Sequence, residues 1–596
     1  MSREIDLIPA ALSQTDIRTQ LPFHLRQFVA EQDYDKRYNA RDQAIWRYVL
    51  SQLVNHLKDK AHPVYFNGLK RTGITLEKIP SIDEMNICLK QLGWRAIVVD
   101  GFIPPQAFME LQSLKVLAIA VDMRSIEHID YTPAPDIIHE AAGHAPIIAD
   151  EEYAEYLQRF GAIGMKAIFN QWDVAVYEAV RSLSIAKEDY DLTNYEIVKF
   201  EDNLNELLAS PGEPSELALL TRLHWWTVEY GLVGNVDDSG IFGAGLLSSL
   251  GESRHCLSDS VLKLPLTVEA VLTSYDITQE QPQLFVTKSC RHLTQILEEY
   301  AATMCYQKGG SSSLASAMSC GVVTTTEYSS GLQVSGRLTR LMTNALGGEI
   351  YIGTEGPTQL SVACKELEGH DTTYHSAGFG SPVGRICNLM KPLEDASEYD
   401  LQIMNIKREQ IVCLEFLSGV TVKGWLKGLT KEDGKIVLLS FENCTVLDPK
   451  GDSLFDPKWG AYDMAVGESI VSVFAGSADR EKFDVFPPKP EEKKSVNRPA
   501  KELPNEIKFY LELRNFRNCL SNNEEVTREE FMELVQESQK SHPAEWLLHL
   551  ELHELSLSMK MHNEITTLHL ESLCKTHQEF KHLINQGLEL IGLENA

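Results

Sequence analysis

The segment Thr132-Pro-Ala-Pro-Asp136-Ile-Ile-His139-Glu140-Ala-Ala-Gly143-His144 places two imidazoles and two carboxylates within nine residues. Neutral imidazole is the commonest protein ligand for zinc, copper, iron and nickel. The segment therefore predicts a metal site. The alternative interpretation is a helix end that carries two partly exposed histidines.

The spacing of the two histidines argues against a zinc protease. In the zinc-protease pattern His-Glu-x-x-His the histidines are four residues apart, which separates them by roughly 40° around a helix. His139 and His144 are five residues apart, which on a regular α-helix separates them by roughly 140°. Both can bind one ion only if the helix ends or distorts between them, and we expect this at Gly143.

Length and composition limit the possible classes of protein. A chain of 596 residues is expected to hold two to four domains. Its formal charge of -30 argues against a nucleic-acid partner. The eleven cysteines are dispersed and contain no Cys-x-x-Cys pair, which favours thiols in a reducing cytoplasm. We expect no membrane partner, because the sequence contains neither a signal peptide nor an apolar run of about 20 residues.

Between residues 42 and 124 the pattern predicts helices and two short strands. Trp46 lies at helical spacing with apolar neighbours and is expected in the core. Ser81 and Glu84 have the spacing of a capping box. Strands are expected at 94–100 and 114–121. Arg124 follows the second strand, and its position alone favours a surface salt bridge over a substrate contact.

Four helices are expected after His144, at 151–170, 172–183, 195–209 and 217–231. The last is apolar nearly all round and should be buried. Glu229 in this helix is then a buried carboxylate, which is costly unless it is paired or binds a metal. Trp225 precedes it by four residues and shares its face.

The segment 243–252, Gly-Ala-Gly-Leu-Leu-Ser-Ser-Leu-Gly-Glu, predicts a tight turn. Its glycine spacing does not fit a dinucleotide-binding loop, and no βαβ unit surrounds it. We expect the glycines to let the backbone approach a ligand or a neighbouring segment.

The second half of the chain changes in character. Residues 309–313, Gly-Gly-Ser-Ser-Ser, predict a domain boundary. Runs rich in β-branched residues then predict a barrel or sandwich up to about Phe474. His370, Asp371 and His375 within it are interpreted as a solvated loop. A charged, proline-rich linker is followed by helices in which His549, His553 and His562 show no metal-binding spacing.

Two histidines require a further ligand, and Glu229 is the best candidate. Two histidines and one carboxylate form the facial triad of non-haem Fe(II) oxygenases, which leaves three positions open. Asp136, three residues before His139, could accept the other ring N–H of that histidine and fix its tautomer. Glu140 is expected beside the metal or beside a cosubstrate.

Three motifs in order resemble the pterin-dependent aromatic amino acid hydroxylases. They are residues 131–146 (YTPAPDIIHEAAGHAP), 225–232 (WWTVEYGL) and 243–252 (GAGLLSSLGE). The resemblance covers roughly residues 30–305. It implies a mainly α-helical catalytic domain that uses Fe(II), a tetrahydropterin such as tetrahydrobiopterin, and O₂.

The resemblance also implies roles for individual residues. His139, His144 and Glu229 match the catalytic iron ligands. The positions matching pterin contacts are Gly101, Ile103, Phe108 and Glu140. The positions matching amino-acid substrate contacts are Arg124, Thr132, Asp136, Trp225 and Ser248, so the resemblance reverses the interpretation of Arg124 as a surface residue. His224 replaces a tyrosine of animal members, and Ala134 replaces a common glutamate.

The predicted architecture is multidomain. It comprises a lead-in at 1–30, a mainly α catalytic domain at 31–307, a β-rich domain at 315–484, a linker at 485–503 and a small helical domain at 504–596. The predicted reaction is conversion of L-phenylalanine to L-tyrosine in the cytoplasm, with the amino acid and the pterin as small-molecule partners. Tyrosine or tryptophan hydroxylation, a zinc-dependent hydrolase and a non-catalytic regulator remain as alternatives.

Overall fold

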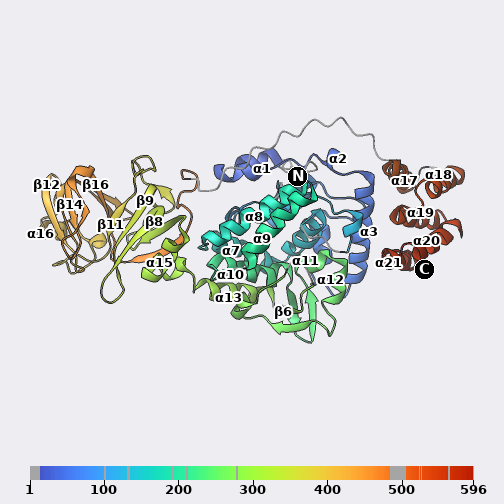
Figure 1. The fold of residues 1–596 in the computed structure, drawn as a ribbon, viewed down its shortest axis with the longest axis horizontal. Coiled ribbons are helices and arrows are strands. Elements are labelled where there is room, and N and C mark those ends of the chain that lie inside the picture. Colours follow the sequence, from blue (N-terminus) through green and yellow to red (C-terminus); the bar gives the residue numbers. More distant parts are fainter. Residues whose placement is uncertain are drawn as a thin grey trace, which may run out of the picture.

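The computed structural model describes residues 14–594 except for 100–102, 131–134, 189–192, 210–211, 277–279, 484–504, 523, 525–526 and 562–563. The chain forms three parts in a row along its longest axis (Figure 1). The middle part runs to about residue 308. A β-rich part lies on one side of it, and the C-terminal helices lie on the other. None of the described helices is long and apolar enough to cross a membrane. All eleven cysteines are free thiols.

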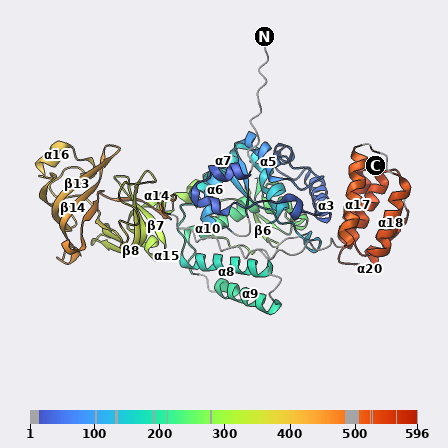
Figure 2. The ribbon, with the colours of Figure 1, turned by 90° about the horizontal axis from the view of Figure 1, so that it is seen from above.

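The middle part is mainly α-helical. Its principal helices are α1 (Gln14–Gln20), α3 (Ala40–Leu57), α4 (Tyr65–Arg71), α5 (Ile82–Leu89), α6 (Pro105–Ser113), α7 (Glu151–Gly164), α8 (Gln171–Glu188), α9 (Asn194–Ala209), α10 (Glu216–His224), α11 (Ala244–Ser248), α12 (Leu250–His255) and α13 (Cys290–Ala301). Helices α8 and α9 pair along one side of this part (Figure 2).

Two small sheets complete the middle part. Strands β1 (Arg95–Val99) and β2 (Val116–Ala120) pair in parallel, close to the two predicted strands. A second sheet has the order β4-β3-β6-β5. Its strands are β3 (Leu232–Asn235), β4 (Asp238–Ile241), β5 (Leu262–Pro265) and β6 (Gln283–Thr287).

The sequence of helix α3 explains where this helix begins and how it packs. Asn39 and Asp42 form a reciprocal capping box at its start. Trp46 is fully buried, as predicted, and its indole N–H donates to the carbonyl of Thr75 at 2.9 Å. The opposite face is covered as well, because the C-terminal helices pack against it.

The predicted capping box of α5 is wrong. Ser81 occupies the N-cap position, but its side chain accepts no hydrogen bond from the helix. The carboxylate of Glu84 instead pairs with the ammonium group of Lys78 at 2.7 Å. A charged partner therefore takes the side chain that the capping box requires.

The β-rich part consists of two antiparallel sheets. The first contains β7 (Val323–Tyr328), β8 (Leu332–Thr343), β9 (Glu349–Val362), β10 (Lys365–Glu366), β11 (Gly380–Pro382) and β17 (Ile470–Ala475). The second contains β12 (Gln410–Glu415), β13 (Thr421–Glu432), β14 (Lys435–Leu447), β15 (Ser453–Phe455) and β16 (Tyr462–Ala465). Strands β11 and β16 lie next to each other, which joins the two sheets.

The glycine- and serine-rich segment after Lys308, where the sequence predicts a domain boundary, is helical. It forms helix α15 (Gly310–Cys320), which packs against β8 and β17. Leu314, Ala317 and Cys320 recur at helical spacing and are buried against the sheet. Three correctly spaced apolar side chains therefore outweigh the flexible composition at the start of the helix.

The described residues of the C-terminal part form five helices: α17 (Asn505–Ser521), α18 (Arg528–Ser541), α19 (Trp546–Ser558), α20 (Glu564–Thr576) and α21 (Lys581–Glu594). Helices α17, α19 and α21 pack on α3. A buried ion pair crosses this contact, since Nε of Arg47 donates to Glu551 at 2.9 Å. His549 and His553 bond to His542 and Thr566, whereas His562 lies outside the described residues.

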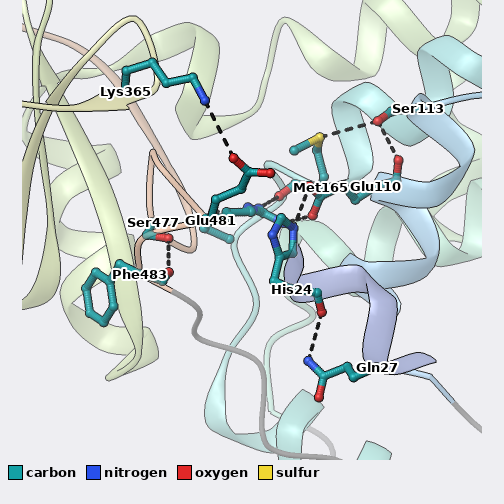
Figure 3. A network of polar contacts seen from close by, with 11 residues as sticks. His24, Gln27, Glu110, Ser113, Met165, Lys365, Ser477, Glu481 and Phe483 are labelled. Carbon is teal, nitrogen blue, oxygen red and sulfur yellow. Dashed lines mark hydrogen bonds and ion pairs between the residues drawn. The ribbon is translucent and has the colours of Figure 1, made fainter. Parts of the chain in front are cut away.

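Arg480 joins the β-rich part to the middle part. Figure 3 shows the surroundings of this contact, with His24, Glu110 and Met165 labelled. Its guanidinium donates to the carboxylate of Glu110 at 2.9 Å and to the carbonyl of Met165 at 2.8 Å. Glu110 is also 2.9 Å from Nε2 of His24. These groups are buried, so the ion pair is shielded from solvent.

Candidate metal centre

His139 and His144 lie in one π-helical segment, η4 (Ile138–His144). In a π-helix the backbone hydrogen bonds run between residues five apart, so these residues lie one above the other. The Nε2 atoms of the two histidines are 3.0 Å apart. The expected distortion is therefore present, but it is a widened helix over seven residues and not a helix end at Gly143.

Glu229 brings a carboxylate to the same point. It is the last residue of a second π-helical segment, η6 (Trp225–Glu229), which continues from α10. Its two oxygens lie 3.3 Å from Nε2 of His139 and 3.3 Å from Nε2 of His144. The three side chains thus each direct a potential ligand atom at one small volume.

The electrostatics of this cluster favour an ionised carboxylate. Burial raises the pKa of Glu229, but the two adjacent imidazoles more than compensate and hold that pKa well below its usual range. Burial lowers the pKa of His224 to about 4. Nδ1 of the neutral His224 lies 3.8 Å from a carboxylate oxygen of Glu229.

Ser248 fixes the ring of His139. Its hydroxyl donates to the carbonyl of Ala244 at 2.7 Å, so its oxygen accepts from Nδ1 of His139 at 3.1 Å. The lone pair of His139 is therefore on Nε2, facing His144 and Glu229. The prediction that Asp136 would accept this ring N–H is wrong, because Asp136 accepts the backbone N–H of His139 at 3.0 Å.

Asp136 is instead the partner of Arg124. The guanidinium donates to both of its oxygens, from Nε at 2.7 Å and from Nη2 at 2.9 Å. Nη1 donates to the carbonyls of Ile129 and Ser248. This pair is buried, so the prediction of a surface salt bridge from the position of Arg124 is wrong. Within the described part of the chain, the remaining N–H on Nη2 has no protein acceptor.

Two glycines allow the segments of the cluster to meet. A Cβ atom on Gly143 would lie 2.7 Å from the carbonyl oxygen of Ala244. One on Gly243 would lie 2.4 Å from the carbonyl oxygen of Glu229. Helix α11 can therefore pack against both π-helical segments only because these positions lack side chains, as the sequence predicted for the second of them.

The donor set of this cluster fits a metal ion. A neutral imidazole lone pair, a second imidazole and an ionised carboxylate converge with separations close to those expected when each donor is about 2.0–2.2 Å from a shared ion. The fixed tautomer of His139 provides the hydrogen-bonded support that ligating histidines generally have.

Comparison with known proteins gives the family. The family model of the biopterin-dependent aromatic amino acid hydroxylases matches residues 23–195 and 191–308. Phenylalanine-4-hydroxylase of Pseudomonas aeruginosa is 30% identical over 278 residues, which are 46% of this chain and 89% of that protein. The chain belongs to the biopterin-dependent aromatic amino acid hydroxylases.

Other members of the family are also similar to this hydroxylase. Human phenylalanine-4-hydroxylase is 28% identical over 238 residues, which are 39% of this chain and 42% of that protein. A crystal structure of the Chromobacterium violaceum enzyme with bound iron(III) and 7,8-dihydrobiopterin is 25% identical. That match covers 48% of this chain and 90% of the other, with a TM-score of 0.37.

Of the residues that the sequence assigned to pterin contacts, Phe108 and Glu140 lie near the hydroxylase's histidine–glutamate cluster. Phe108 of α6 meets His224 edge to face, with ring centroids 6.1 Å apart. Ile103 precedes the same helix and packs with Phe108 against a buried apolar cluster. Burial raises the pKa of Glu140 to about 8, which the nearby His144 only partly offsets. Gly101 lies outside the described residues.

The residues assigned to the amino acid are only partly described. Thr132 lies outside the described residues. Trp225 is stacked between two tyrosines of the hydroxylase, with centroid distances of 4.2 Å to Tyr275 and 4.5 Å to Tyr230. The sequence did not single out Tyr275, because nothing in its local pattern distinguishes it from a core aromatic.

Proposed function

We propose that this hydroxylase converts L-phenylalanine to L-tyrosine with O₂ and a tetrahydropterin at an Fe(II) ion held by His139, His144 and Glu229. The convergence of these three side chains carries the proposal. The substrate follows from the relatives, since the bacterial and animal proteins named above are phenylalanine hydroxylases. Family membership favours this activity over a zinc-dependent hydrolase or a non-catalytic regulator.

The iron and the pterin together supply the activation of O₂ from which one oxygen atom enters the ring. The protein chain positions the reacting groups. Three protein ligands leave the remaining positions of an octahedral ion open. Ser248 keeps His139 in the tautomer that presents Nε2, and α11 holds Ser248 in place.

Arg124 is proposed to hold the carboxylate of the amino acid through the N–H on Nη2 that has no protein acceptor. Asp136 fixes the plane of the guanidinium by accepting two of its hydrogen bonds. A planar, fixed guanidinium recognises a carboxylate with more directional control than a flexible ammonium group. Anchoring one end of the substrate determines which ring carbon faces the metal.

The pterin is proposed to bind beside Phe108, Ile103, Gly101 and Glu140. Phe108 offers an aromatic surface for the flat pterin ring. A pKa of about 8 leaves Glu140 mostly protonated at neutral pH, so its carboxyl can donate a hydrogen bond to a neutral ring as well as accept one.

Product analysis with the full-length chain tests the proposed reaction. The iron-loaded protein is incubated separately with L-phenylalanine, L-tyrosine and L-tryptophan under ¹⁸O₂ with tetrahydrobiopterin, and the products are identified by mass spectrometry. We expect tyrosine containing one ¹⁸O atom from phenylalanine, with stoichiometric pterin oxidation. Preferential turnover of tyrosine or tryptophan would change the substrate assignment, and pterin-independent turnover would overturn the proposed reaction.

We further propose that residues 31–307 are the catalytic unit and that residues 315–484 and 504–596 are separate domains joined by residues 485–503. The matched family residues end at 308, which supports the first boundary. The distinct sheet-rich and helical parts support the other boundaries.

A further inference from the structure

A second cluster of potential metal ligands lies in the β-rich part, far from the catalytic cluster in the sequence. Nδ1 of His370 is 3.1 Å from Nε2 of His375 and 3.9 Å from a carboxylate oxygen of Asp463. The three potential ligand atoms lie within 4.8 Å of one another. His375 is only 7% exposed and Asp463 only 6%, whereas Asp371 is exposed. The interpretation of this segment as a solvated loop therefore holds for Asp371 but is wrong for His375.

Backbone hydrogen bonds fix the positions of the two histidines. They belong to residues 367–379, between β10 and β11. The carbonyl of His370 accepts from the N–H of Leu360, and that of His375 accepts from Thr358, both in β9. Asp371 accepts the N–H groups of Thr373 and Tyr374 and thereby forms the turn between the histidines.

Asp463 comes from β16 in the other sheet, and its carboxylate is fixed as well. One oxygen accepts from the hydroxyl of Ser440 at 2.6 Å, and the other accepts from the hydroxyl of Tyr374 at 3.0 Å. Both donors are neutral. Among the described residues, no lysine or arginine forms an ion pair with this carboxylate. A buried carboxylate with only neutral donors favours a cation beside it.

The catalytic cluster provides an internal comparison. His139 and His144 are five residues apart, and their facing nitrogens are 3.0 Å apart. His370 and His375 are also five residues apart, with a corresponding distance of 3.1 Å. Two donors at about 2.0–2.1 Å from a tetrahedral zinc ion are separated by a similar distance. The second cluster therefore has the same pair of imidazole donors and a carboxylate.

We propose that His370, His375 and Asp463 bind one Zn²⁺ ion, with a water molecule or the hydroxyl of Tyr374 as the fourth ligand. Nitrogen and oxygen donors in this number fit zinc, which prefers four ligands. The ion would tie residues 367–379 to β16 and so link the two sheets of the β-rich part. This site is independent of the proposed iron site.

Metal analysis of a full-length chain without its catalytic histidines tests the proposal. The His139→Ala/His144→Ala protein is stripped with a chelator, dialysed against buffered Zn²⁺ and measured by mass spectrometry of the elements. We expect about one zinc per chain. Zinc below about one tenth of an equivalent would overturn the proposal, and this result does not depend on any change at the second cluster.

Variants of the second cluster then test its ligands. Adding His375→Ala or Asp463→Asn to the same background should weaken zinc binding at least tenfold, whereas adding His577→Ala, at a partly exposed histidine paired with Glu579, should leave it unchanged. Asp463→Asn retains one acceptor oxygen, which can bond to Ser440, and can keep the fold. Co²⁺ should give visible absorption in the background protein that is lost in both ligand variants. Unchanged zinc binding in a folded Asp463→Asn protein, confirmed by circular dichroism, would overturn the assignment.

Discussion

Nδ1 of His139 donates to the hydroxyl oxygen of Ser248, and the same hydroxyl donates to the carbonyl of Ala244. This two-step chain runs from the π-helical segment η4 into helix α11. It connects the orientation of a proposed ligand to the backbone of a glycine-rich turn. The nitrogen of His139 that is proposed to bind the metal is therefore selected by a residue distant in the sequence.

Replacement of Ser248 by alanine should weaken iron binding about 10–100-fold, the range found when a partner of a metal-ligating histidine is removed. The reason is loss of the acceptor that fixes the His139 tautomer. Iron affinity is measured by competition with a chromophoric chelator. Ser253→Ala is a matched control, because that hydroxyl donates to the carbonyl of Leu250 within α12. Equal iron affinity in both variants would contradict this role.

Glu229→Gln and His139→Ala should each abolish hydroxylation and iron binding together. Each change removes one of the converging donors, and Glu229→Gln also removes the negative charge. Iron content and pterin-dependent product formation are measured on the same preparation. Full iron stoichiometry in both variants would show that the ligand assignment is wrong.

Arg124→Lys should raise the KM for phenylalanine about 10–100-fold, because a charged hydrogen bond is worth roughly 1.5–3 kcal/mol. Lysine keeps the charge but cannot pair with both oxygens of Asp136 while it holds a substrate. Initial rates separate KM from kcat, and iron content should remain near one per chain. Arg181→Lys, on α8, is the control. A fall in iron content with an unchanged KM would indicate a structural role only.

Gly143→Ala should destabilise the fold by about 1–3 kcal/mol, the usual cost of overpacking. The new methyl group would meet the carbonyl of Ala244 at 2.7 Å and push α11 away from η4. Denaturant unfolding measures the change. Gly592→Ala is the control, because a Cβ there meets no atom within 4 Å. Similar unfolding midpoints for the two variants would contradict the close approach.

Acid should weaken the attachment of the C-terminal helices. Burial raises the pKa of Glu551, but Arg47 and Arg517 more than compensate, so its pKa in the folded protein is below the ordinary 4.5. The unfolded chain therefore binds the proton more readily, and the stabilisation present above about pH 4.5 is lost as the pH falls. Calorimetry from pH 7 down to about pH 3 should show this loss beginning near pH 4.5.

Glu551→Gln should remove most of that pH dependence and destabilise the protein by about 3–5 kcal/mol, because it leaves the buried guanidinium of Arg47 without its charge partner. Arg517 still pairs with Glu554 in this variant. Glu571→Gln, an exposed position on α20, should change neither quantity. A wild-type pH profile in the Glu551→Gln protein would rule out this ion pair as its cause.

The sequence predicted the parts of the site that depend on residue type and burial. The apolar surroundings of Glu229 identified it as a metal-ligand candidate, and the spacing of His139 and His144 required a distorted helix. The form of the distortion was not predictable, because α-helix and π-helix differ in the register of backbone hydrogen bonds and not in composition.

Contacts between distant segments account for most of what the sequence did not reveal. The bond from His139 to Ser248 depends on how closely α11 approaches η4. The segment containing His370 and His375 contains polar residues typical of a loop, and only the neighbouring sheet brings Asp463 to it. Local periodicity carries no information about such pairs.

Because of the two π-helical segments, the number of residues between the proposed ligands helps to determine the geometry of the metal site. Deleting one alanine from residues 141–142 would leave every proposed ligand in the sequence, yet would produce His-Glu-Ala-Gly-His, the histidine spacing of zinc proteases. The same deletion would rotate everything after it by about 100° relative to η4. Inserting or deleting a single residue is therefore expected to damage this site more than most substitutions around it.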